Sequence, residues 1–102
     1  MQANPDLAFL DAAAIPPVLT VRSRFPGDRY GGPRHRKVKK MLIARRIDVR
    51  ARRALPLVAF GNAVVWIPGF RPPRPFMAQP GGKRYILLEA RPLERVGSGE
   101  KP

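Results

Sequence analysis

The sequence predicts a small α+β domain, a layered unit with short, mainly antiparallel strands packed around one or two helices. The chain has 102 residues, of which 44% are hydrophobic, so it can build one modest core. Its 13 prolines and 9 glycines limit the length of regular elements. The hydrophobic periodicity gives the order strand, helix, helix, hairpin, strand. Together these observations indicate one domain with two kinds of secondary structure.

The clearest strand pattern lies in residues 18–25, after a possible edge strand at residues 7–10 and a helical turn at residues 11–14 that two prolines end. Leu19, Val21 and Phe25 fall on one face of this segment and predict a core-facing side. The other face carries Thr20, Arg22 and Arg24, and it should be a cationic outer surface. A tight turn at residues 26–28 and a glycine-rich basic loop at residues 30–36 should follow.

Residues 37–47 contain neither glycine nor proline and are the best helix candidate. Val38, Met41 and Leu42 share one side and two isoleucines another, which predicts a helix buried on two sides. Asp48 is a suitable N-cap for a second short helix over residues 49–55, which Pro56 closes.

A β-hairpin is predicted at residues 57–60 and 63–67, because Gly61-Asn62 suits a two-residue turn with glycine first. Residues 68–80 contain five prolines and should form an exposed loop that carries Arg71 and Arg74, before a last strand at residues 85–90. We therefore expect a flexible N-terminus over residues 1–7, the domain over residues 8–93 and a disordered tail over residues 94–102.

The charge is strongly positive and unevenly placed. Twenty Lys and Arg oppose seven Asp and Glu, a net charge of +13, and residues 18–53 hold thirteen basic side chains with only Asp28 and Asp48 in opposition. Such a concentration attracts polyanions in a salt-sensitive way. General solubility is the alternative interpretation, although it does not require acidic residues to be kept out of one stretch.

The residue inventory argues against catalysis by this chain. It has no cysteine, one histidine (His35, interpreted as a solvent-facing loop residue) and carboxylates scattered singly, so we expect no catalytic residue, no metal site and no cofactor. Neither a GxxxxGK[ST] loop nor a GxGxxG fingerprint occurs. Its apolar runs are too short to span a bilayer and Asp6 and Asp11 stand near the N-terminus, so we expect a cytoplasmic protein with no membrane partner.

The basic residues instead suggest an RNA-binding surface. Phosphate groups suit the arginines of the predicted strand and turn, because Arg22 and Arg24 share one strand face and the turn brings Arg29 back near it. They also suit the lysines at the start of the first predicted helix, where the helix dipole disfavours a positive charge, and the two arginines of the second helix that stand three residues apart. The aromatic residues suggest little base stacking, because Phe25, Phe60 and Trp66 pattern as core and only Tyr30, Phe70 and Phe76 lie in loops. A solvated charged face is the alternative. The candidate RNA-binding residues are Arg22, Arg24, Arg29, Lys37, Lys39, Lys40, Arg50 and Arg53.

The segments AFLDAAAIPPVLTVRSRFPGDRY, KVKKMLIARRIDVRARRALPLV and VVWIPGF resemble the C-terminal domain of bacterial tRNA(Ile)-lysidine synthetase over about residues 8–92. VRSRFPGDRY is the most specific part. By motif, Arg22, Arg24 and Arg29 with Gly27 and Asp28 match the family's RxRxPGDR signature, Lys39 and Lys40 its lysine pair, and Arg53 with Pro56 its arginine-proline step. In this match Gly27 and Asp28 are structural turn residues, Asp28 ordering the turn or pairing with an arginine.

The resemblance implies an accessory domain that holds tRNA, chiefly its acceptor end, for a cytoplasmic enzyme that uses ATP, Mg²⁺ and lysine to convert the wobble cytidine of tRNA(Ile) to lysidine. The SGGxDS-type motif of the catalytic domain is missing here, so this chain alone is not expected to be the ligase, and a catalytic domain would lie on the same or another chain. Two alternatives stay open: a general structured-RNA or ribosome-binding protein, and a protein-docking domain for an acidic partner.

Overall fold

The computed structural model describes residues 4–92, which form two sheets and two short α-helices. Strands β1 (Leu7–Asp11) and β7 (Tyr85–Glu89) make a two-stranded antiparallel sheet. The second sheet has the order β2-β5-β6-β3-β4, and only its β3–β6 pair is parallel. The observed fold class is therefore α+β, as predicted. The remaining elements are β2 (Thr20–Arg22), β3 (Arg29–Tyr30), β4 (Arg36–Lys37), α1 (Val38–Ala44), α2 (Val49–Ala54), β5 (Leu57–Phe60), β6 (Ala63–Trp66) and two 3₁₀ turns, η1 (Ala12–Ala14) and η2 (Arg74–Phe76).

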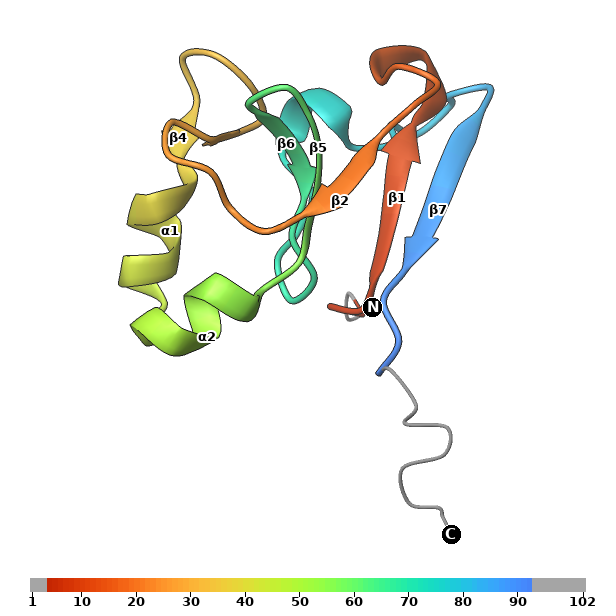
Figure 1. Ribbon diagram of the computed structural model, residues 1–102. Helices are drawn as coiled ribbons and strands as arrows, with labels where there is room; N and C mark the ends of the chain where they lie inside the picture. The colour runs from red at the N-terminus through yellow and green to blue at the C-terminus, as the bar shows by residue number, and fades with distance from the viewer. Residues whose placement is uncertain (1–3, 93–102) are drawn as a thin grey trace, which may run out of the picture.

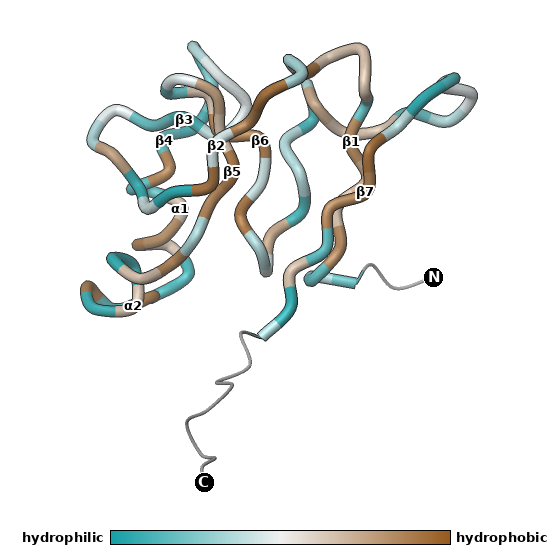
Figure 2. The backbone as a smooth tube through the Cα atoms, turned by 45° about the vertical axis from the view of Figure 1, so that its right-hand side comes forward, coloured by the Kyte–Doolittle hydropathy of each residue, from teal (hydrophilic) through white to brown (hydrophobic). Residues whose placement is uncertain are grey.

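The five-stranded sheet is the middle layer of the domain. Figure 1 shows α1 and α2 on one side of it and the β1–β7 ribbon on the other. One core lies on the helix side, where Val38, Met41 and Leu42 of α1 pack with residues of β5 and β6. A second core lies on the ribbon side and includes Leu10 and Trp66. Apolar residues accordingly gather in β5, β6 and the ribbon, as Figure 2 shows.

The locally encoded elements form where the sequence predicts them. The hairpin of β5 and β6 turns at Gly61-Asn62, and Gly61 takes a positive φ of 57° that glycine adopts readily. Asp48 caps α2, because its carboxylate accepts a hydrogen bond from the amide of Ala51 at 2.8 Å. Asp11 accepts from Ala13 in the same way at the start of η1.

The first long strand is shorter than predicted, and its predicted alternation holds only in part, since Leu19 packs partly buried against the second core and Thr20 is exposed, both as predicted. β2 covers only residues 20–22, and Val21 and Phe25, expected in the core, are 69% and 52% exposed. Arg22, expected to face solvent, is turned inward, where it meets the buried Asp28. The alternation fails because pairing a buried carboxylate is worth more than covering one valine on an edge strand.

The first helix also ends early. The prediction spanned residues 37–47, but Lys37 belongs to β4 and α1 stops at Ala44, before Arg46 takes a left-handed φ of 59°. Ile43 is exposed, so the predicted burial on two sides is wrong. A single face of α1 contacts the sheet, as in an ordinary surface helix.

Two predicted loops are parts of the core. The segment expected to be an exposed loop at residues 68–80 contains η2 and buries Phe70 and Phe76. Residues 30–36 begin and end in strands, and Tyr30 is buried with its hydroxyl donating to the Arg71 carbonyl at 2.6 Å. The three aromatic residues suggested as exposed are therefore unavailable for base stacking, whereas Trp66 is buried as expected.

Residues 5–7 differ from the flexible N-terminus of the prediction. The Pro5 carbonyl accepts a hydrogen bond from Gly69 at 2.9 Å, the Asp6 carbonyl accepts one from Ala90 at 2.8 Å, and Leu7 already pairs with β7. The predicted tail at residues 94–102 lies outside the described residues.

Candidate nucleic-acid interface

The segment after β2 is held by one buried ion pair. Arg22 donates from Nη1 to Asp28 Oδ2 at 2.8 Å and from Nη2 to Oδ1 at 2.9 Å, a bidentate contact. The same guanidinium donates to the Gly61 carbonyl at 2.7 Å, and the Phe25 ring covers it at 4.1 Å. The Arg22 side chain is only 12% exposed and that of Asp28 is fully buried. Arg22 is therefore occupied within the fold.

The turn between these two residues is built around Asp28. Its carboxylate accepts from the Phe25 amide at 2.8 Å and from Asn62 Nδ2 at 3.1 Å, in addition to Arg22. Gly27 has a φ of 88° after a proline, the pattern of a type II turn. Burial by itself would raise the pKa of Asp28, but the hydrogen bonds from Arg22, Phe25 and Asn62 outweigh it and lower the pKa below 3.8. The carboxylate is thus held in its charged form.

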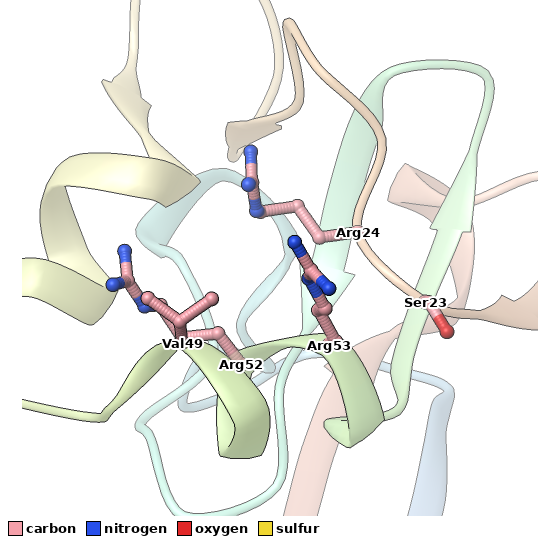
Figure 3. A pocket seen from close by; sticks show the side chains of 5 residues that line it. All are labelled: Ser23, Arg24, Val49, Arg52 and Arg53. Atoms are coloured by element: carbon pink, nitrogen blue, oxygen red, sulfur yellow. The ribbon is translucent and has the colours of Figure 1, made fainter.

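Beside this turn lies a basic pocket of about 250 Å³, which we call the arginine pocket. It is lined by Arg24 and Ser23 from the segment after β2 and by Val49, Arg52 and Arg53 from α2. Figure 3 shows the Arg53 guanidinium directed toward Arg24 across the pocket, with Arg52 extending past Val49. No carboxylate lines it, and over residues 4–92 salt bridges are made by only two arginines, Arg22 and Arg91. Within the described residues, Arg24, Arg52 and Arg53 therefore have no partner of opposite charge.

Arg52 is the lining residue that sequence reasoning missed. Its Nε atom is buried without a hydrogen-bond partner, which is costly unless an acceptor arrives. The signal was present, because a helix capped at Asp48 places residues 49, 52 and 53 on one face at spacings of three and four. The prediction used the spacing of Arg50 and Arg53 instead, and Arg50 is exposed but does not line the pocket.

The other predicted basic residues are accessible but placed elsewhere. Arg29 lies opposite Lys37 in the β3–β4 pair, and it donates to the His35 carbonyl at 2.7 Å, so it partly serves to hold that loop. Lys39 and Lys40 are exposed on α1, and no acidic side chain stands in its first turn. The structure thus brings Arg24 and Arg53 together and sets Arg22 apart from them.

Over residues 4–92 no three His, Cys, Asp or Glu side chains come close enough to hold a metal ion. In the same part of the chain, no helix has both the length and the apolar character needed to cross a membrane.

Comparison with known proteins gives a consistent result. Residues 19–88 match the family model described as the TilS substrate C-terminal domain. The tRNA(Ile)-lysidine synthase of Symbiobacterium thermophilum is 33% identical over 98 residues, which cover 93% of this chain and 20% of that protein. The synthase of Persephonella marina is 35% identical over 79 residues, 74% of this chain and 17% of that protein.

A solved structure described as the crystal structure of the TILS C-terminal domain has a TM-score of 0.69 and 30% identity, over 87% of this chain and 72% of its own. The chain spans about a fifth of the length of the synthases it matches. On the matched model, the relatives and the shared fold, this chain belongs to the TilS substrate C-terminal domain family.

Proposed function

We propose that this chain is the tRNA-binding accessory domain of a tRNA(Ile)-lysidine synthase, the cytoplasmic enzyme that joins lysine to the wobble cytidine of tRNA(Ile) with ATP. The observation that carries the proposal is the arginine pocket, which three arginines line with no carboxylate among them. Membership in a family named for a substrate domain of lysidine synthases supports tRNA as the polyanion.

The pocket suits phosphate more than it suits a base. Guanidinium groups form paired hydrogen bonds with phosphate oxygens, and Arg24, Arg52 and Arg53 can do so from two different elements. Lys39 and Lys40 on α1 add exposed charge to the same helical side of the domain (Figure 1). Tyr30, Phe70 and Phe76 are buried and the exposed Phe25 ring covers Arg22, which favours recognition of backbone shape over unpaired bases. A helical segment such as the acceptor end is the proposed RNA target.

The chemistry is assigned to a portion outside this chain. The ATP and Mg²⁺ of the reaction need phosphate-binding backbone and clustered oxygen ligands, but the chain has no GxxxxGK[ST] loop, and residues 4–92 lack an acidic cluster. The proposal gives this domain the task of holding the tRNA while a catalytic domain on the same or another chain modifies it.

The test measures the affinity of the chain for a tRNA(Ile) transcript by filter binding. Exchanging two pocket arginines, Arg24→Gln with Arg53→Gln, should weaken binding about tenfold, or about 1.4 kcal/mol. The matched control removes the same charge from the β7 end of the molecule, Lys83→Gln with Arg84→Gln, two exposed residues outside the pocket. The control should change the affinity by less than about threefold.

Equal losses in the two double variants would contradict the arginine pocket as the RNA site, because they would show attraction by net charge alone. Equal affinity of the unaltered chain for an unrelated structured RNA of the same length would contradict the tRNA assignment and favour a general RNA-binding protein.

A further inference from the structure

The outer face of the β1–β7 ribbon is apolar and exposed. Cross-strand partners face the same side, so Phe9 lies beside Leu87, with Tyr85 diagonal to Phe9 at a ring separation of 5.6 Å. Phe9, Tyr85 and Leu87 are 46%, 62% and 50% exposed. The opposite face, which includes Ala8 and Leu10, fills the second core. The outer face of the ribbon therefore exposes apolar side chains that belong to neither core of the described domain.

This face continues into a groove of about 610 Å³, and we call the two together the ribbon groove. Leu7 and Phe9 belong to both, and Met77, which bridges to Leu10 beside β1, adds apolar surface, whereas the Arg45 guanidinium covers the buried Phe70 ring at 4.0 Å. Arg45 and Arg71 line the hollow, which has no Asp or Glu, while Asp11 and Glu89 stand at the two ends of the strand face, opposite Tyr85 and Leu7. Contiguous apolar surface bordered by polar residues is typical of protein interfaces.

The position of the groove indicates what covers it. The matched region of the synthases is a C-terminal domain, so in those proteins some four-fifths of the polypeptide lies outside it and leads into its first residues. In this structure Asn4 and Pro5, the first described residues, line the groove itself. Figure 1 shows that β1 begins at the end of the ribbon where β7 finishes. A polypeptide that leads into the domain therefore arrives beside the groove.

We propose that the ribbon groove docks the catalytic portion of a lysidine synthase through an apolar segment flanked by carboxylates. The apolar side chains of the segment cover Phe9 and Leu87, and its carboxylates meet Arg45 and Arg71, which have no carboxylate partner within residues 4–92. This surface is distinct from the arginine pocket, so docking and RNA binding can occur together.

The experiment titrates the chain into the Symbiobacterium thermophilum synthase lacking its matched 98-residue segment, by calorimetry without RNA. The variant Phe9→Gln with Leu87→Gln should bind at least about tenfold more weakly, because two apolar anchors are lost. The control, Val21→Gln with Ile43→Gln, changes two apolar residues that are at least as exposed but lie on other elements, and it should bind like the unaltered chain. Arg71→Glu should also weaken the complex, most strongly at low salt.

Absence of a complex between the unaltered chain and the truncated synthase would overturn the proposal. So would an equal loss in the control pair, or a dimer of the chain in sedimentation that Phe9→Gln with Leu87→Gln dissolves, since a second copy would then cover the face. Thermal unfolding of each variant verifies that it is folded, and Arg71→Glu tests the groove without altering an apolar residue. Because RNA is absent, the result is independent of the proposed tRNA binding.

Discussion

Arg22 and Arg24 stand two residues apart in the same segment, and their surroundings are opposite. Arg22 is bound to Asp28 at 2.8 Å, covered by Phe25 and nearly buried. Arg24 lines the arginine pocket with Arg53 and has no carboxylate partner among residues 4–92. Arg22 therefore holds a turn, whereas Arg24 lines an open pocket. The comparison shows that a neighbouring carboxylate decides whether an arginine is held within the fold, as Asp28 holds Arg22.

Removing the carboxylate of Asp28 should have the largest effect, because it takes away the partner that distinguishes Arg22 from Arg24. Asp28→Asn leaves the Arg22 cation almost buried, 12% exposed, without a counter-charge. Removing one member of a buried pair costs about 3 to 5 kcal/mol, a large part of the stability of a small domain. Urea unfolding followed by circular dichroism measures the loss.

A second aspartate provides the control for that loss. Asp48→Asn removes the same charge, but Asn caps helices as well as Asp does, so the free energy of unfolding should change by less than about 0.5 kcal/mol. Similar small changes in both variants would mean that the Arg22–Asp28 pair does not hold the fold.

Acid should also remove the stability that the ionised Asp28 carboxylate contributes to the fold. The pKa of Asp28 lies below 3.8 in the folded chain because of its hydrogen bonds, so the unfolded chain takes up its proton first as the pH falls. The contribution of Asp28 is complete above its unfolded pKa and is lost as the pH falls through the folded pKa. Unfolding free energies measured from about pH 5 to about pH 1 should therefore decline more steeply for the unaltered chain than for Asp28→Asn. Parallel curves would contradict the lowered pKa.

What sequence reasoning could and could not predict follows the range of the interactions. The β5–β6 hairpin and the cap of α2 depend on neighbours within three residues, and both were predicted correctly. The orientation of Arg22 depends on Asp28 and on the Gly61 carbonyl, 39 residues away, so the alternation of residues 18–25 gave the wrong face for Arg22. A pattern of period two has no information about a distant acceptor.

The candidate site divides in the same way. Arg24 and Arg53 were named from local patterns, but their approach across the arginine pocket depends on how α2 packs against the segment after β2. The end of α1 was predicted at residue 47 and lies at Ala44, because Arg46 adopts a positive φ that is uncommon for arginine. Phe70 was wrongly predicted to be exposed, because its proline-rich segment packs onto the core without a helix or strand pattern in the sequence.

The salt dependence of RNA binding sharpens the contrast between the two arginines. Each phosphate contact contributes roughly 0.7 to 0.9 to the slope of log affinity against log salt. Arg24→Gln with Arg53→Gln should lower the slope by about 1.5, whereas Arg22→Gln, measured where it is still folded, should leave it unchanged because Arg22 is occupied by Asp28. Filter binding from low to high salt checks both. A lower slope in Arg22→Gln would show that its charge reaches the RNA.

The smallest expected effect on tRNA affinity comes from removing the N-cap of α2, the helix that carries Arg52 and Arg53. Asp48→Ala removes the hydrogen bond to the Ala51 amide and should lower stability by about 1 kcal/mol. Because α2 has only six residues, loosening its first turn also loosens Arg52 and Arg53, and tRNA affinity should fall about twofold. Asp48→Asn changes the charge identically and keeps the cap, so the difference between the two variants isolates the order of the helix from its electrostatics. If Asp48→Ala and Asp48→Asn bind tRNA equally, the affinity does not depend on the order of α2.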